Sequence, residues 1–127
     1  MAARPPTPKS SNAAPSPGAI AETLAEQFLI RKGLKPVQRN FRCRGGEIDL
    51  IMKDGSGLVF VEVRLRTNKS FAGAAESIAG RKQQRVMLAA QHYLAALGST
   101  PPCRFDVIAL DALDAARIEW IRDAFQA

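Results

Sequence analysis

Two alternating segments joined by a short turn constrain the fold of this 127-residue chain more than any other feature. Residues 46–53 and 58–66 carry apolar side chains at every second position, a pattern typical of β-strands. The segment between them, residues 54–57, reads DGSG and has the composition of a tight turn. The sequence therefore predicts a β-hairpin, and the length of its turn fixes which residues face each other.

The predicted register places four charged side chains on one face of the hairpin. Counting back along both strands from the turn sets Asp49 opposite Glu62 and Glu47 opposite Arg64. Because side chains alternate between the two faces of a strand, all four point to the same side of the sheet. The other side is apolar and is the predicted core: Ile48, Leu50, Met52, Val59, Val61 and Val63.

The aspartate opposite a glutamate is the feature of this hairpin that indicates a metal-binding or catalytic site. Opposed side chains start about 5 Å apart, where two negative charges repel each other. A Mg²⁺ ion between them would remove that repulsion, and it completes its shell with water and phosphate oxygens. Such an ion can polarise a phosphodiester, so one prediction is a metal-dependent nuclease. The pattern leaves open a ladder of ion pairs, Glu47 with Arg64 and the other acids with Arg42 or Arg66.

The remaining segments predict a mixed sheet covered by helices. Apolar residues at helical spacing cover 19–32 and 77–97, and strand patterns cover 36–43, 104–110 and 117–121. The order αβββαββ, with a hairpin before a crossover helix, predicts an α/β domain with a mixed β-sheet flanked by helices. Residues 1–17 hold five of the eight prolines, so we expect a disordered tail followed by one domain over residues 18–127.

Positive charge is concentrated in the middle of the chain. The formal net charge is +6, and residues 31–85 hold thirteen basic and five acidic side chains. Such a surplus suits phosphate contacts, although a solvated basic face would have the same composition. No segment is apolar enough to span a membrane or to form a signal core, and the two cysteines form no metal-ligand motif. We therefore expect a cytoplasmic protein without membrane contact.

Two isolated polar residues predict structural roles. Asp106 lies in an otherwise apolar strand segment, so we expect it to have a buried partner such as an arginine. His92 is the only histidine, and without a second ligand nearby in the sequence we expect it on a helix surface.

Five short motifs follow one another along residues 18–125: GEIDLI at 46–51, FVEVR at 60–64, RKQ at 81–83, CRFDV at 103–107 and WIRDAF at 120–125. Together they resemble the YraN family of uncharacterised bacterial proteins. The resemblance implies a restriction-endonuclease-like fold of the Holliday-junction-resolvase type, with its PD-(D/E)xK metal site.

The resemblance also implies roles for the hairpin acids. Asp49 matches the motif aspartate and Glu62 the motif glutamate, so both are implied to be catalytic and to bind Mg²⁺ or Mn²⁺. Glu22, on the first predicted helix, matches the acid that completes the metal site in the resolvase-like subgroup. Arg64 stands where the motif has lysine. Because arginine stays protonated, we expect Arg64 to contact the scissile phosphate or position water, and not to act as a base.

The function predicted from residues and resemblance together is hydrolysis of DNA phosphodiesters, with branched or structured DNA of recombination or repair as the implied substrate. We expect recognition of shape over sequence, because phosphate contacts carry no base information. Two alternatives stay open: a non-catalytic nucleic-acid-binding module in which Arg64 marks lost chemistry, and an adaptor for an unknown protein partner. A homodimer would suit an enzyme that cuts two strands, although no residue pattern indicates one. The expected nucleic-acid contacts are Arg42, Arg44, Arg66, Lys69, Arg81, Lys82 and Arg85.

Overall fold

The first helix, α1, spans Pro17–Arg31 and begins two residues before the predicted start at residue 19. The computed structural model describes residues 15–66, 80–114 and 117–126. Ser16 caps the helix, since its Oγ accepts a hydrogen bond from the backbone N–H of Ala19 at 3.1 Å. Proline at the first helical position suits the start of a helix because its nitrogen needs no hydrogen-bond acceptor. Gly33, with a φ of 98°, follows the helix and lets the chain turn back toward the sheet.

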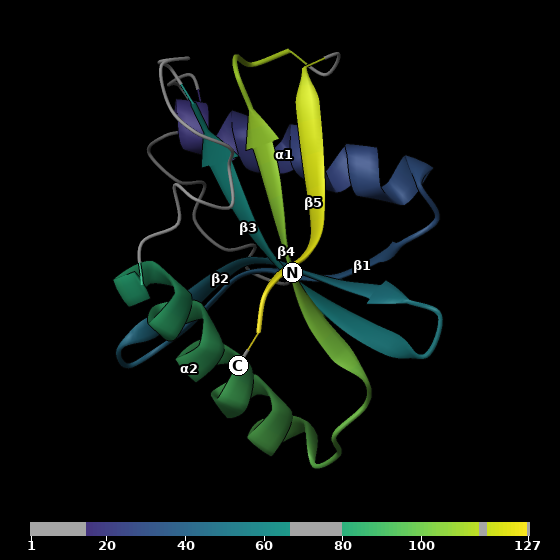
Figure 1. Ribbon diagram of the computed structural model, residues 1–127, viewed down its shortest axis with the longest axis vertical. Coiled ribbons are helices and arrows are strands. Elements are labelled where there is room, and N and C mark those ends of the chain that lie inside the picture. Colours follow the sequence, from purple (N-terminus) through teal and green to yellow (C-terminus); the bar gives the residue numbers. More distant parts are fainter. Residues whose placement is uncertain (1–14, 67–79, 115–116, 127) are drawn as a thin grey trace, which may run out of the picture.

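The strands form one five-stranded mixed sheet in the order β1-β2-β3-β4-β5. Neighbouring strands are antiparallel except β3 and β4, which are parallel. A parallel pair needs a crossover connection, and α2 lies in the chain between these two strands (Figure 1). The predicted α/β fold and the order αβββαββ are therefore confirmed. The elements after α1 are β1 Lys35–Cys43, β2 Gly46–Asp54, β3 Gly57–Leu65, α2 Gly80–Leu97, β4 Cys103–Leu110 and β5 Ile118–Phe125.

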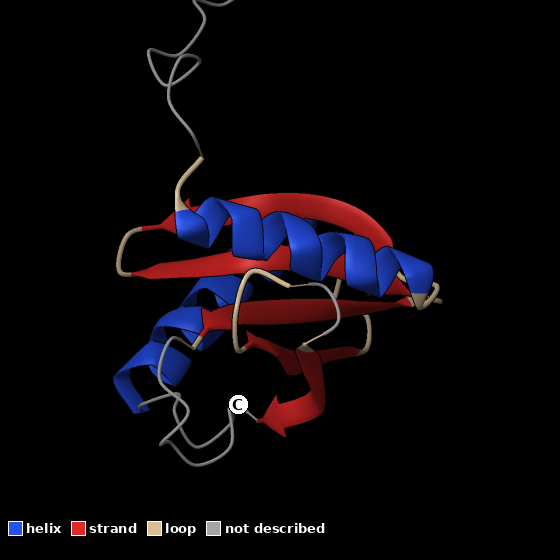
Figure 2. Cartoon of the chain, turned by 90° about the horizontal axis from the view of Figure 1, so that it is seen from above, coloured by secondary structure: helices blue, strands red, loops and turns tan. Residues whose placement is uncertain are grey.

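The two helices cover opposite faces of the sheet (Figure 2). α1 packs Ala25 and Leu29 into one apolar cluster with residues of β2, β3 and β4. α2 packs Val86 and Ala89 into a second cluster, which contains Phe60 of β3. The central strands are thus buried on both faces, because Ile51 and Phe60 are buried on the face opposite Leu50 and Val61.

The hairpin of β2 and β3 has the predicted register from its turn as far as Leu50 and Val61. The ladder between the two strands ends at this pair. Beyond it, β2 continues only along β1, and β3 continues only along β4. Asp49 and Glu62 are the next residues on their strands, so they lie where β2 and β3 separate. The carboxylates therefore sit at a fork in the sheet and not within a regular ladder.

The predicted core face of β2 is wrong at one position, Ile48. Ile48 belongs to the cluster under α2, whereas Leu50 and Met52 belong to the cluster under α1. Asn40 of β1 lies between the β1 partners of Ile48 and Leu50, and its φ of 54° is left-handed. The regular alternation of faces on β2 is thus broken between Ile48 and Leu50, at Asp49. The Asp49 side chain accepts a hydrogen bond from the backbone of β3.

The last strand, β5, spans Ile118–Phe125 and is longer than the predicted strand 117–121. Asp106 of β4 binds it through hydrogen bonds. Asp106 is fully buried and accepts hydrogen bonds from Trp120 Nε1 and from the Asp123 backbone N–H, each at 2.9 Å. Arg104 Nε lies 3.1 Å from Asp106 Oδ1, which confirms the predicted arginine partner. These bonds hold β5 where its register with β4 shifts.

Some predictions concern residues that the structure does not describe. Lys69, the predicted helical residues 77–79 and residues 1–14 of the predicted tail lie outside the described residues. His92 is exposed on α2, as predicted. Within residues 15–66, 80–114 and 117–126, neither helix has the length and apolar character needed to cross a membrane.

Candidate active site

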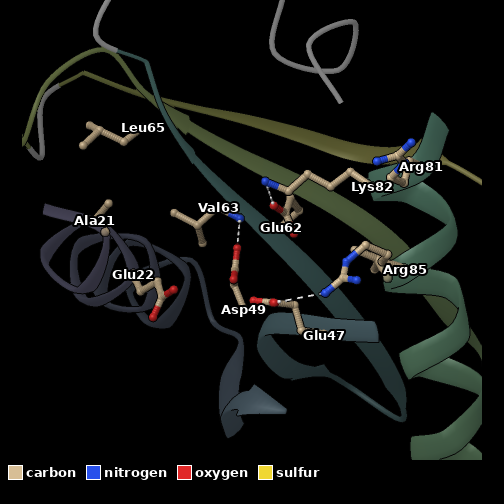
Figure 3. A pocket seen from close by; sticks show the side chains of 12 residues that line it. Ala21, Glu22, Glu47, Asp49, Glu62, Val63, Leu65, Arg81, Lys82 and Arg85 are labelled. Carbon is tan, nitrogen blue, oxygen red and sulfur yellow. Dashed lines mark hydrogen bonds and ion pairs between the residues drawn. The ribbon is translucent and has the colours of Figure 1, made fainter. Parts of the chain in front are cut away.

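A pocket of about 420 Å³ opens at the fork between β2 and β3, bordered by the start of α1 and the start of α2 (Figure 3). The two strands and α1 contribute four acids, and α2 contributes three bases. The pocket is therefore acidic on the side of the strands and basic on the side of α2. Its lining residues are Gly18, Ala21, Glu22, Glu47, Asp49, Glu62, Val63, Leu65, Arg81, Lys82, Arg85 and Val86.

Asp49 is held in the pocket by the backbone of β3. Its Oδ2 accepts a hydrogen bond from the Val63 N–H at 2.9 Å, and the residue is only 9% exposed. Burial raises the pKa of the Asp49 carboxyl to about 7, and the nearby charge of Glu62 adds to the rise. The Val63 hydrogen bond opposes both effects without cancelling them. The charge of Lys82 also lowers this pKa, but less than burial and Glu62 raise it.

Glu62 lies beside Asp49 and has a cationic partner on α2. Lys82 Nζ is 2.6 Å from Glu62 Oε2, and Glu62 is 3% exposed. Burial raises the pKa of the Glu62 carboxyl in spite of this ion pair, and the charge of Glu47 raises it further. Within the described residues, Lys82 thus forms an ion pair with Glu62 and acts on Asp49 only through its charge, without a contact.

Glu22 reaches the pocket from α1, as predicted, and its charge also raises the pKa of Asp49 (Figure 3). Arg39 of β1 restrains it, since Arg39 Nη2 lies 3.6 Å from Glu22 Oε1. Arg39 also lies 3.8 Å from Glu26 and donates to Thr23 Oγ1 at 3.2 Å. Arg39 therefore fixes the acidic side of α1 against β1 and positions Glu22.

The basic wall of the pocket comes from the first turns of α2. Arg81, Lys82 and Arg85 all line the pocket, as expected for phosphate contacts (Figure 3). Arg85 Nη2 lies 3.5 Å from Glu47 Oε1. The predicted ion pair of Glu47 with Arg64 is therefore wrong, because α2 crosses over the fork and brings Arg85 to Glu47 instead.

The remaining predicted arginines lie outside this pocket. Arg64 is not among the lining residues, and its buried Nε has no hydrogen-bond partner within the described part of the chain. Arg66 Nη2 is 2.7 Å from Asp111 and 3.4 Å from Glu119, so it joins the ends of β3, β4 and β5. Two further residues, Arg42 and Arg44, are exposed on and just after β1 without lining the pocket.

The donor set of the pocket fits a hard divalent cation held by two carboxylates. Asp49 uses Oδ2 for its hydrogen bond with the Val63 N–H, and Glu62 uses Oε2 for its ion pair with Lys82. Within the same residues, no group of three or more Asp, Glu, His or Cys side chains is close enough to hold a metal. The predicted third ligand, Glu22, is thus not part of a ligand cluster in this structure. Mg²⁺ is commonly bound by one or two carboxylates, with water and phosphate oxygens as its other ligands.

Sequence reasoning missed the contact of Lys82 with Glu62. Lys82 was predicted only as a phosphate contact in a basic cluster. Its position in the RKQ motif, beside two arginines, gave no sign of a carboxylate partner. The contact depends on how α2 crosses the sheet, which a local pattern does not determine.

The element order αβββαββ and the mixed five-stranded sheet agree with the fold that the sequence motifs implied. A family model described as the uncharacterised protein family UPF0102 matches residues 21–110. The chain therefore belongs to UPF0102, the YraN family of the resemblance above.

Relatives in this family resemble the chain over most of its length. The chain is 56% identical over 110 residues to a UPF0102 protein of Methylobacillus flagellatus, covering 87% of this chain and 96% of the relative. It is 58% identical over 111 residues to a UPF0102 protein of Cupriavidus taiwanensis, covering 87% of this chain and 82% of the relative. A UPF0102 protein of Saccharophagus degradans is 51% identical over 110 residues, covering 85% of this chain and 91% of the relative.

Proposed function

We propose that this protein is a Mg²⁺- or Mn²⁺-dependent phosphodiesterase that acts on DNA. The observation that carries the proposal is the burial of Asp49 and Glu62 side by side, under a row of bases on α2. Burial of two neighbouring carboxylates costs stability, and of these two only Glu62 has an ion-pair partner among the described residues. A divalent cation would compensate for the charge of Asp49.

The chemistry of such a site is hydrolysis. A bound Mg²⁺ polarises the phosphodiester and lowers the pKa of water in its shell. Asp49 and Glu62 would hold the ion from the side of the strands, and Glu22 would add negative charge from α1. In the reaction, the water oxygen would bond to phosphorus as the phosphorus–oxygen bond to the leaving sugar breaks, and a proton given up by the water would be taken by the leaving oxygen.

The bases of α2 provide the binding energy for phosphate. Arg81 and Arg85 are exposed at the rim of the pocket, so their guanidinium groups can reach phosphate oxygens on both sides of the reacting one. Arg64 lies outside the pocket lining. We therefore place the phosphate contacts on α2 and not on β3.

The choice of DNA, and of branched DNA in particular, follows from the family resemblance. Contacts to phosphate carry no sequence information, so the arrangement of phosphates around the pocket would select the substrate by shape. Such binding weakens steeply with salt because each phosphate contact releases counterions.

The test is cleavage of end-labelled DNA by the wild-type protein and by Asp49→Asn. Single strand, duplex, flap and four-way junction are incubated with Mg²⁺, with Mn²⁺ and with EDTA. Glu119→Gln is the matched control, because Glu119 is an exposed carboxylate on β5 outside the pocket. We expect cleavage that requires metal, survives in the control and is lost in Asp49→Asn.

Absence of metal-dependent cleavage in the wild-type protein would overturn the proposal. Gel shifts of the same DNA panel then separate the alternatives. Salt-sensitive binding without cleavage indicates a non-catalytic nucleic-acid-binding module, and absence of binding indicates an adaptor for another protein.

A further inference from the structure

The pocket contains a lysine, but not at the position where the motif has one. Arg64 on β3 stands at the motif lysine and does not line the pocket. Lys82 on α2 does line it, and its Nζ lies 2.6 Å from Glu62 Oε2. In Figure 3 the Lys82 side chain extends from α2 over Glu62, so a helix supplies the ammonium group at the carboxylate pair.

We propose that Lys82 supplies the positive charge that acts directly on this carboxylate pair. It neutralises Glu62 before metal binds and contacts the substrate phosphate once metal has taken over that neutralisation. The inference rests on the proposed phosphodiesterase function and adds a named residue to it. It also assigns to Lys82 the phosphate contact that the motif position suggested for Arg64.

The chemistry of the side chain supports this assignment. An ammonium group is a compact charge with three donor hydrogens on a flexible stem, whereas a guanidinium is a wide planar fork. One hydrogen on Lys82 satisfies Glu62 Oε2, which leaves two for phosphate oxygens. The Lys82 side chain is 41% exposed while that of Glu62 is 3% exposed, so the lysine can move toward substrate and the glutamate cannot.

Competition between Lys82 and metal determines in which direction the metal affinity changes when the lysine is removed. Lys82 and a divalent cation both neutralise Glu62, so removal of the ammonium group should strengthen metal binding. Removal of one positive charge near a metal ion, even in a water-like environment, is worth about fivefold in affinity. A lysine that only supports the fold would show the opposite, because a loosened pocket binds metal more weakly.

The experiment measures Mn²⁺ affinity by calorimetry without DNA, near pH 8, together with single-turnover cleavage of the best DNA substrate. Lys82→Met is compared with the wild-type protein, with Lys82→Arg, with Arg64→Met and with Lys53→Met. Lys53 is an exposed lysine at the far end of β2, outside the pocket, so its variant removes the same charge elsewhere. Thermal unfolding of each variant checks that it is folded, and Lys82→Arg keeps the test valid if Lys82→Met does not fold.

We expect Lys82→Met to bind Mn²⁺ about fivefold more tightly or better and to cleave at least about a hundredfold more slowly. Lys82→Arg should keep the wild-type Mn²⁺ affinity and lose part of the cleavage rate, and Lys53→Met should match the wild-type protein. If the folded Lys82 variants bind Mn²⁺ and cleave as the wild-type protein does, the inference is overturned while the phosphodiesterase function stands. It is equally overturned if Arg64→Met, and not Lys82→Met, gives the tighter binding and slower cleavage. A wild-type protein that neither binds Mn²⁺ nor cleaves DNA overturns both proposals.

Discussion

Asp49 accepts the backbone N–H of Val63 at 2.9 Å, so a side chain occupies the donor that β3 presents where its ladder with β2 ends. The carboxylate thereby lies between two strands and not on one face of the sheet. This hydrogen bond satisfies a donor of β3 beyond the end of the β2–β3 ladder and holds Asp49 in the lining of the pocket. The end of the β2–β3 ladder thus creates both the fork and the position of the Asp49 carboxylate.

The position of Asp49 makes stability depend on pH. Its folded pKa of about 7 lies above the value of about 4 in an unfolded chain, so the folded state binds the proton more tightly. This contribution to stability is complete below about pH 4 and is lost as the pH rises to about 7. The raised pKa of Glu62 acts in the same direction.

Urea unfolding at several pH values measures this dependence. For the Asp49 proton, the free energy of unfolding should fall by up to about 1.4 kcal/mol per pH unit across this range. Asp49→Asn keeps an oxygen for the Val63 N–H and should have a flatter profile. At pH 8 the variant should be more stable than the wild-type protein. Parallel profiles for the two proteins would show that Asp49 has an ordinary pKa.

Mg²⁺ should stabilise the folded protein in the absence of DNA. An ion that binds only the folded state at ten times its dissociation constant adds about 1.4 kcal/mol to the free energy of unfolding. The effect should appear near pH 8 and fade near pH 5, where protons compete for Asp49. Thermal unfolding in a Mg²⁺ titration, with ionic strength held constant by NaCl, measures it. Equal stabilisation of Asp49→Asn would place any bound ion elsewhere.

The hairpin register could be predicted from sequence because it depends on residues close together in the chain. The turn fixes the pairing as far as Leu50 and Val61, and the structure agrees to that point. The face of Ile48 could not be predicted in this way. The change of face lies beside the left-handed Asn40 of β1, and nothing in the alternating pattern of β2 indicates it.

The acids of the site could be predicted better than their partners. Asp49 and Glu62 follow from the register and the motifs, but their cations come from elements whose placement is a tertiary property. Lys82 meets Glu62 only because α2 crosses the sheet in one particular way. Arg39 is a basic residue on an exposed strand by sequence, yet in the structure it binds Glu22 of α1. A long basic side chain can reach several acids, and the tertiary placement of the elements determines which of them it contacts.

Asp106 should be essential for the fold although it lies outside the pocket. It is fully buried and holds Arg104, Trp120 and the backbone of β5. Its removal leaves Arg104 half-paired and two donors unsatisfied, so Asp106→Ala should cost about 3–5 kcal/mol. Asp54→Ala is the matched control, because Asp54 binds the same arginine at 3.0 Å but is 44% exposed. We expect that control to cost at most about 1 kcal/mol in urea unfolding, and equal losses would contradict the assigned role of burial.

The close approach of β2 to α2 at Gly46 should determine the geometry of the basic wall. A Cβ at Gly46 would overlap the backbone oxygen of Arg85 and lie 3.0 Å from the backbone nitrogen of Ala89. Both are main-chain atoms that no rotamer change can move, so Gly46→Ala must displace the helix. We expect the variant to lose about 2 kcal/mol of stability. Because Lys82 moves with α2, the Gly46→Ala variant should also lose cleavage activity.

Gly80→Ala is the control, because it makes the same substitution at a position in α2 itself. Nothing lies within 4 Å of a Cβ at Gly80, and alanine favours a helix over glycine. That variant should be as stable as the wild-type protein or more so, with unchanged DNA cleavage. Urea unfolding and single-turnover cleavage of both variants measure the two effects together. If Gly46→Ala loses stability but keeps the wild-type cleavage rate, the seating of α2 on β2 does not set the position of the site's bases.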